Sequence, residues 1–123
     1  MLCYVVGRIP VHFGKRMKIK SLQYTSYHKL VRDRIPEIIE ADGICETLSD
    51  ADYIDLLDQK LNEELAEYQE SKSLEELADL LEVIQAVVKA RGWTLEELEQ
   101  LRADKAARRG GFEKKILLKE VRE

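Results

Sequence analysis

The chain has 123 residues and a mass of 14.3 kDa, the size of one ordinary domain. Hydrophobic residues make up 45% of the sequence and charged residues 36%, which indicates a globular protein with a densely charged surface. Apolar runs fall far short of the ~20 residues that span a bilayer, so a membrane-spanning helix is excluded. The net charge is −4, but residues 1–34 carry eight Lys and Arg residues against one acidic residue, and the remainder carries −11.

This charge distribution bears on the class of partner. A large nucleic-acid interface needs many phosphate contacts, which an acidic body disfavours, so we expect no nucleic-acid partner. A small phosphorylated ligand remains compatible, because acidic residues can hold a metal ion that binds its phosphates.

Residues 1–26 form a basic extension of unclear role. It contains five basic residues, no acidic residue and a short β-like run at Cys3–Val6, and Met17 is an alternative start. It lacks the long apolar region of a signal peptide. Cys3 and Cys45 lie far apart and form no CxxC pair, so we expect neither a zinc site nor a disulfide. Two buried thiols in a reducing compartment, hence a cytoplasmic protein, are the expectation.

Helix signals dominate from residue 27 onward. Pro36 suits the first turn of a short helix over 36–41. Ser49 is a good N-cap for a long helix to about residue 70, and Ser73 with Glu76 forms a capping box that opens a second helix over 74–90. The two helices, joined by a short turn, predict a helical hairpin.

The C-terminal region continues this pattern. Thr94 with Glu97 opens a third main helix that runs to about residue 108 and is ended by Gly110-Gly111. Residues 115–121 are expected to form a short extended segment. Because strands and helices do not alternate, the sequence predicts an all-α fold, a helical hairpin with flanking helices.

The helix over 74–90 carries two apolar faces. One comprises Leu77, Leu81, Ile84 and Val88, and the other comprises Leu80, Val83 and Val87. A helix that is apolar over so much of its surface must be covered on more than one side. One hairpin cannot do this alone, so we expect a homodimer.

Four acidic residues can be placed on the two hairpin helices. Glu64 and Glu67 lie three residues apart on one helix, and Glu76 and Asp79 lie three apart on the next. An antiparallel hairpin brings the two pairs together near its turn. Two like charges ~4 Å apart cost about 4 kcal/mol at an effective dielectric constant of 20. A divalent cation relieves this repulsion, and oxygen-only ligands suit Mg²⁺ or Mn²⁺; solvated acids paired with lysines are the alternative.

The chain from residue 27 to 121 resembles the MazG-like, all-α nucleoside triphosphate pyrophosphohydrolases, in particular the phosphoribosyl-ATP pyrophosphohydrolase-like group. The segments that carry the resemblance are KLVRDRIPEII at 29–39, EELAE at 63–67, ELAD at 76–79 and KAARRGGF at 105–112. The resemblance implies a pyrophosphohydrolase domain over 27–123, completed as a helical bundle by homodimerisation.

The resemblance also implies an activity and a set of site residues. The expected reaction is the Mg²⁺-dependent cleavage of a nucleoside triphosphate between the α and β phosphates, which gives a monophosphate and pyrophosphate. The implied metal ligands are Glu64, Glu67, Glu76 and Asp79. Glu63 is the candidate catalytic residue that orients a ligand or the attacking water. The candidate substrate-binding residues, whose cationic groups match phosphate oxygens, are Lys29, Arg32, Lys105 and Arg109.

Three other functions stay open at this point, and one of them is association with nucleic acid through the basic extension over residues 1–26. The group's label suggests phosphoribosyl-ATP hydrolysis in histidine biosynthesis instead of house-cleaning of the nucleotide pool. A non-catalytic helical dimerisation or adaptor module, with only solvated acids, is an alternative of another class.

Overall fold

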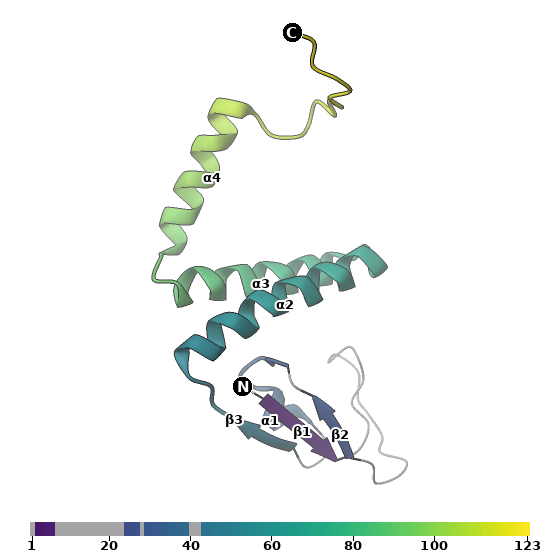
Figure 1. The fold of residues 1–123 in the computed structure, drawn as a ribbon, viewed down its shortest axis with the longest axis vertical. Helices are drawn as coiled ribbons and strands as arrows, with labels where there is room; N and C mark the ends of the chain where they lie inside the picture. The colour runs from purple at the N-terminus through teal and green to yellow at the C-terminus, as the bar shows by residue number, and fades with distance from the viewer. Residues whose placement is uncertain (1, 7–23, 28, 40–42) are drawn as a thin grey trace.

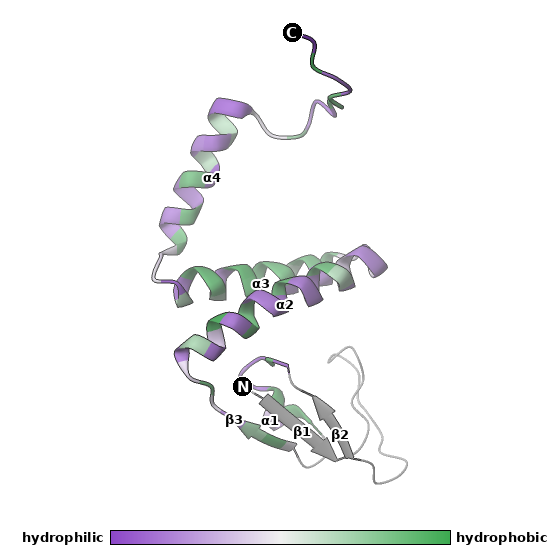
Figure 2. Cartoon of the chain, in the orientation of Figure 1, coloured by the Kyte–Doolittle hydropathy of each residue, from purple (hydrophilic) through white to green (hydrophobic). Residues whose placement is uncertain are grey.

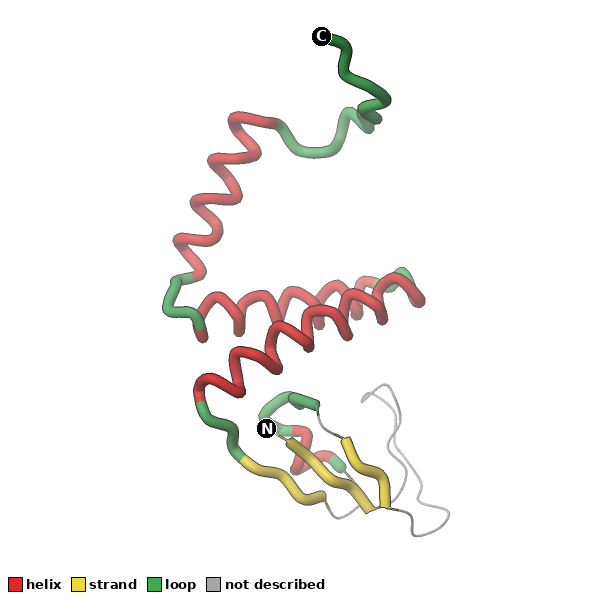
Figure 3. Tube along the Cα trace, viewed as in Figure 1, coloured by secondary structure: helices red, strands yellow, loops and turns green. Residues whose placement is uncertain are grey.

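The computed structural model describes residues 2–6, 24–27, 29–39 and 43–123 (Figure 1). Three short strands and four helices alternate with loops in this part of the chain (Figure 3). In chain order they are β1 (Leu2–Val6), β2 (Tyr24–Tyr27), α1 (Ile35–Ile38), β3 (Gly43–Glu46), α2 (Asp50–Ser71), α3 (Leu74–Ala90) and α4 (Leu95–Arg109). Among the described helices none has the length and apolarity to cross a membrane.

Helices α2 and α3 form the predicted antiparallel hairpin and lie side by side (Figure 1). The Ser49 side chain caps α2 by accepting a hydrogen bond from the backbone N–H of Asp52 at 3.3 Å. The Ser73 side chain caps α3 in the same way from Glu76 at 3.4 Å. Between the helices Lys72 has φ 53°, a left-handed conformation that ends α2 and reverses the chain. Both predicted helices are confirmed to within a residue at each end.

The core lies between the hairpin and the loop that precedes α1. Leu30 from this loop, Leu57 from α2 and Val83 from α3 are buried against one another. The partly buried side chains packed against this cluster are Leu48, Tyr53, Leu56, Leu61, Ala86, Val87 and Ala90. One predicted apolar face of α3, that of Val83 and Val87, therefore packs in the core.

The other apolar face of α3 is open only in the first half of the helix, because Val88 near its end is buried. Leu74, Leu77 and Leu81 are exposed along the helix, and Leu65 of α2 is exposed as well. The strongly hydrophobic character of α3 is visible along its length in Figure 2. The expectation that α3 is apolar on more sides than its own hairpin can cover is confirmed for these leucines.

Helix α4 projects away from the hairpin, and the C-terminal segment continues beyond it (Figure 1). Thr94 caps α4 by accepting a hydrogen bond from the backbone N–H of Glu97 at 3.1 Å. The helix ends at Gly110, whose φ is 82°. Glycine suits this position because a residue with a Cβ rarely adopts a positive φ. Residues 110–123 form neither helix nor strand, so the segment expected over 115–121 pairs with no strand in the described chain.

The short helix near Pro36 differs from expectation in its bounds. The sequence predicts 36–41, whereas α1 covers Ile35–Ile38 and leaves the helical conformation at Ile39, whose ψ is 127°. Pro36 does lie in the first turn, where its missing N–H costs no helical hydrogen bond.

A three-stranded antiparallel sheet departs from the all-α expectation. The strand order is β2-β1-β3, so β1 from the N-terminal extension pairs with β3 just before α2. Only the β-like run at Cys3–Val6 indicates it in the sequence. Most of the residues that the structure describes lie in helices, so the mostly helical character is confirmed. The sheet also joins residues on both sides of the expected boundary at residue 26.

The expectation of two free thiols is wrong. Cys45 is disulfide-bonded. The chain has one other cysteine, Cys3, and the two Cα atoms are direct partners in the β1–β3 register. Sequence spacing conceals this pair because strand pairing, rather than a CxxC motif, brings the two positions together.

Candidate metal centre

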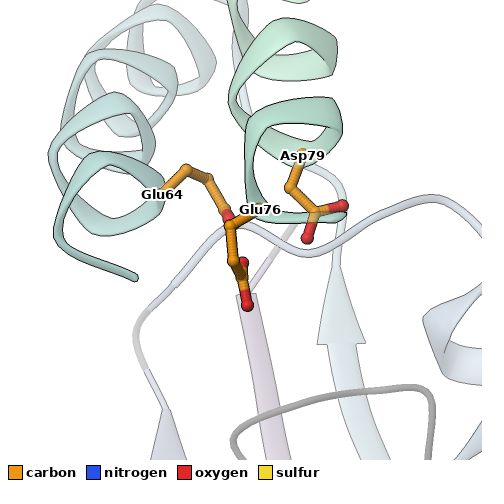
Figure 4. Close-up of side chains that lie close together, drawn as sticks. All are labelled: Glu64, Glu76 and Asp79. Atoms are coloured by element: carbon orange, nitrogen blue, oxygen red, sulfur yellow. The ribbon is translucent and has the colours of Figure 1, made fainter. Parts of the chain in front are cut away.

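Three acidic side chains converge near the closed end of the hairpin. Glu64 extends from α2, and Glu76 and Asp79 extend from the first two turns of α3 (Figure 4). Each offers a carboxylate oxygen, and these three oxygens lie within 4.8 Å of one another. Glu64 and Glu76 are only 6% and 4% exposed, whereas Asp79 is partly buried at the rim. The structure thus brings three of the four predicted metal ligands together.

The local sequence explains this convergence. The i,i+3 spacing of Glu76 and Asp79 places both on one face of α3. The turn that ends α2 at Ser71 lets α3 begin at Leu74, so the last two turns of α2 lie opposite the first turns of α3. Glu64 belongs to the same side of α2 as the buried Leu57, two helical turns earlier. Its carboxylate is therefore directed between the helices instead of into water.

Glu67, the fourth predicted ligand, interacts with Glu64 and Glu76 but does not contribute one of the three converging oxygens. Its pKa is raised from 4.5 to about 7, first by burial, then by the charge of Glu64 and by hydrogen bonds with Glu64 and Glu76. A hydrogen bond between two carboxyl groups requires one proton between them. Glu67 is therefore protonated below neutral pH and loses this proton as the pH rises through about 7.

Two lysines neutralise part of the surrounding charge. The Lys60 Nζ lies 3.2 Å from Glu63 Oε2 and 3.3 Å from Glu64 Oε1, and the Lys60 side chain is only 13% exposed. The Lys29 Nζ lies 3.4 Å from Glu63 Oε1. Glu63, the predicted catalytic residue, is thus held between two lysines beside the acidic group. Sequence analysis missed Lys60, although its i,i+3 and i,i+4 spacing to Glu63 and Glu64 is visible in the sequence.

The predicted substrate-binding residues divide into two pairs. Lys29 and Arg32 lie at the acidic group, where the Arg32 guanidinium donates to Asp79 Oδ1 at 2.6 Å. Lys105 and Arg109 are exposed on α4, which leaves the opposite end of α3 from the acidic residues (Figure 1). Within one chain, therefore, only Lys29 and Arg32 accompany the predicted metal ligands.

The donor set fits a small hard cation. All of the converging groups are carboxylates, the ligand type that Mg²⁺ and Mn²⁺ prefer. Glu64 Oε2 is buried and finds no hydrogen-bond partner within the described residues. Leaving a buried carboxylate oxygen without a partner costs on the order of 1–3 kcal/mol, and a coordinated cation removes this cost. The residues present therefore fit a divalent metal better than they fit a solvated acidic surface.

Comparisons with known proteins add little to this geometry. No family model and no solved structure matches the chain. A protein of Mycolicibacterium smegmatis (strain ATCC 700084 / mc(2)155), described as uncharacterized, is 57% identical over 42 residues, which are 32% of this chain and 43% of that protein. The chain thus spans less than half the length of the relative it matches.

Proposed function

We propose that this protein is a Mg²⁺-dependent nucleoside triphosphate pyrophosphohydrolase that releases a nucleoside monophosphate and pyrophosphate. In this proposal it is a cytoplasmic homodimer that removes non-standard or excess nucleoside triphosphates from the nucleotide pool. The observation that carries the proposal is the convergence of buried Glu64 and Glu76 with Asp79 from two helices. The resemblance of the motifs at 29–39, 63–67, 76–79 and 105–112 to MazG-like enzymes supplies the reaction class.

The proposed chemistry needs little covalent participation from the protein. Phosphoryl transfer depends mainly on positioning and on neutralising the developing charge. A bound Mg²⁺ would supply charge neutralisation on phosphate oxygens. Glu64, Glu76 and Asp79 would hold it, with Glu67 as a further oxygen donor once its proton has left.

The cationic residues at the rim have a defined part in this proposal. Arg32 pairs with Asp79 in the ligand-free chain and is exposed, so it can exchange this carboxylate for a substrate phosphate. Lys29 contacts one carboxylate oxygen of Glu63 and Lys60 contacts the other, so the two lysines hold the Glu63 carboxylate beside the site. Glu63 is thereby positioned to orient the attacking water, whose oxygen bonds to phosphorus as the phosphoanhydride bond breaks.

The homodimer and the compartment belong to the same proposal. The exposed leucines of α3 support self-association, because an apolar stripe on a helix is normally covered in the native assembly. The compartment in this proposal rests on the nucleotide substrate alone, because the disulfide of Cys45 removes the argument from free thiols.

A substrate panel tests the function. The protein is incubated with Mg²⁺ and each canonical, deoxy and oxidised nucleoside triphosphate, and with phosphoribosyl-ATP, while monophosphate and pyrophosphate are quantified. Glu76→Gln should lower turnover by at least about 100-fold, since even residues that only support metal ligands cost 10–100-fold. Glu82→Gln, an exposed acid on the same helix, is the matched control and should retain activity.

The panel also separates the alternatives. Turnover of phosphoribosyl-ATP alone would move the protein into histidine biosynthesis. Absence of pyrophosphate release from every substrate, together with a melting temperature that Mg²⁺ does not change, would refute the enzyme and leave the helical adaptor.

A further inference from the structure

The C-terminal quarter of the chain lacks a hydrophobic core of its own. We call residues 94–123 the C-terminal arm; it comprises α4 and the segment that follows, all of it described, and none of its side chains is buried. Phe112 is 96% exposed. The other large exposed apolar residues of the arm are Leu98, Leu101, Ile116, Leu117, Leu118 and Val121.

Such an arm is not expected to persist alone in water. Isolated helices of about 12–15 residues are marginal even with favourable sequences, and most helical stability in proteins comes from packing an apolar face. Helix α4 has 15 residues and buries none of them within its own chain. The arm therefore requires a surface outside the contacts that this chain provides.

The exposed leucines of the hairpin offer a matching surface. Leu74, Leu77 and Leu81 follow one another on α3 at helical spacing, and we call them the leucine stripe. The hairpin that bears the stripe, residues 50–90, contains twelve acidic and three basic residues. Residues 105–123 of the arm contain seven basic and three acidic residues. The two surfaces are therefore both apolar, and the positive net charge of residues 105–123 complements the negative net charge of the hairpin, whereas residues 94–104 of the arm contain four acidic residues and one basic residue.

The connection between α3 and α4 directs the arm away from its own stripe (Figure 1). The backbone N–H of Gly92 donates to Lys89 O at 3.1 Å, and that of Trp93 donates to Val88 O at 3.0 Å. Gly92 has φ 89°, and Thr94 caps α4 immediately afterwards. These hydrogen bonds close the end of α3, and α4 then leads away from the hairpin (Figure 1).

We propose that the C-terminal arm of one copy docks on the leucine stripe of a second copy, and that the exchange is reciprocal. Each copy carries both surfaces, so two copies can satisfy both arms in a closed two-fold dimer. The 30 residues of the arm match the roughly 20–30 residues that each side of a standard interface provides. The inference rests on the self-association part of the proposed function and is independent of the catalytic part.

Mass measurement of the full chain and three variants tests the arm exchange. The first variant ends at Trp93 and so lacks the whole arm, the second carries Leu77→Ser with Leu81→Ser, and the control carries Ile38→Ser, an exposed apolar residue on α1. Light scattering after size exclusion should give a dimer for the full chain and the control. Each of the other two variants should raise the dimer dissociation constant by about 100-fold, the effect of losing interface hot spots.

A mixing experiment distinguishes exchange from other arrangements. The shortened chain retains an intact stripe and the leucine variant retains an intact arm, so an equimolar mixture should recover one of the two interfaces and form mixed dimers. Circular dichroism checks that each variant keeps the helical content of the hairpin.

The outcomes that overturn the proposal are distinct. A monomeric full chain would refute the dimer of the proposed function together with the arm exchange. A shortened chain that dimerises as tightly as the full chain would refute the arm exchange alone, and so would two variants that gain no association on mixing. The substrate panel reads the catalytic proposal separately in each case.

Discussion

The pKa of Glu67 allows the acidic group to be tested without any substrate, through the pH dependence of protein stability. In the folded protein this pKa is about 7, against 4.5 for an ordinary glutamate, because burial, the Glu64 charge and hydrogen bonds with Glu64 and Glu76 favour the protonated form. The native state therefore binds this proton more tightly than the unfolded chain does. Its contribution to stability is fully present below pH 4.5 and is lost as the pH rises to about 7.

The size of the effect follows from the same values. Each pKa unit corresponds to about 1.4 kcal/mol, so the interval from 4.5 to about 7 gives an upper limit of about 3.4 kcal/mol. Glu67 is only partly buried, and solvent screening reduces this to about 1–2 kcal/mol. Glu67→Gln, which keeps the shape and removes the charge, should therefore raise the free energy of unfolding of the metal-free protein by about 1–2 kcal/mol at pH 8, with little gain at pH 4.5.

Urea unfolding followed by circular dichroism is the assay, in chelator and in excess Mg²⁺ at both pH values. A cation bound only by the native state at 100 times its Kd adds about 2.7 kcal/mol, and wild type should gain more from Mg²⁺ at pH 8 than at pH 4.5. Glu70→Gln, an exposed residue one turn further along α2, is the control. The reasoning fails if Glu67→Gln changes metal-free stability no more than Glu70→Gln does, or if Mg²⁺ stabilises neither protein.

Three further predictions concern the surroundings of the site. Leu57→Ala should lower the free energy of unfolding by about 2–5 kcal/mol in urea melts, because Leu57 is 4% exposed, whereas Ile38→Ala at an exposed position of α1 should stay within about 0.5 kcal/mol; similar losses would contradict the assigned core. Arg32→Ala should change stability by less than about 1 kcal/mol, since the Asp79 pair is partly exposed, yet raise the KM for the nucleotide; an unchanged KM would remove Arg32 from substrate binding. Cys45→Ser should match the effect of a reductant on the wild type, a loss of about 2–4 kcal/mol that is typical of a disulfide, measured as earlier unfolding in urea; equal melts with and without reductant would argue against the bond.

The helical part of the fold could be predicted from the sequence because its signals are local. Ser49, Ser73 and Thr94 each cap the helix that the sequence assigns to them, through bonds that span three residues. The pairing of the strands could not be predicted from the sequence. The strands β1 and β3 are nearly 40 residues apart, and strand pairing depends on contacts between distant segments.

The candidate site divides in the same way. The spacing of Glu76 and Asp79 and the short turn after α2 predict that they meet Glu64, and the structure brings these three together. The ion pair of Arg32 with Asp79 spans 47 residues and depends on how the loop before α1 packs, which no local pattern encodes. Lys60 was recoverable from helical spacing alone.

The two-residue turn between α2 and α3 has a consequence for the order of folding. Contacts across a hairpin with so short a connection close small loops, whereas pairing β1 with β3 must first close a loop of about 40 residues, which costs more chain entropy. Rates fall as the sequence separation of native contacts grows. We therefore expect the hairpin to form first during folding, so that the carboxylates of Glu64, Glu76 and Asp79 gather before the sheet assembles. A cation present at that stage would act on the folding nucleus itself and raise the folding rate, in addition to slowing unfolding.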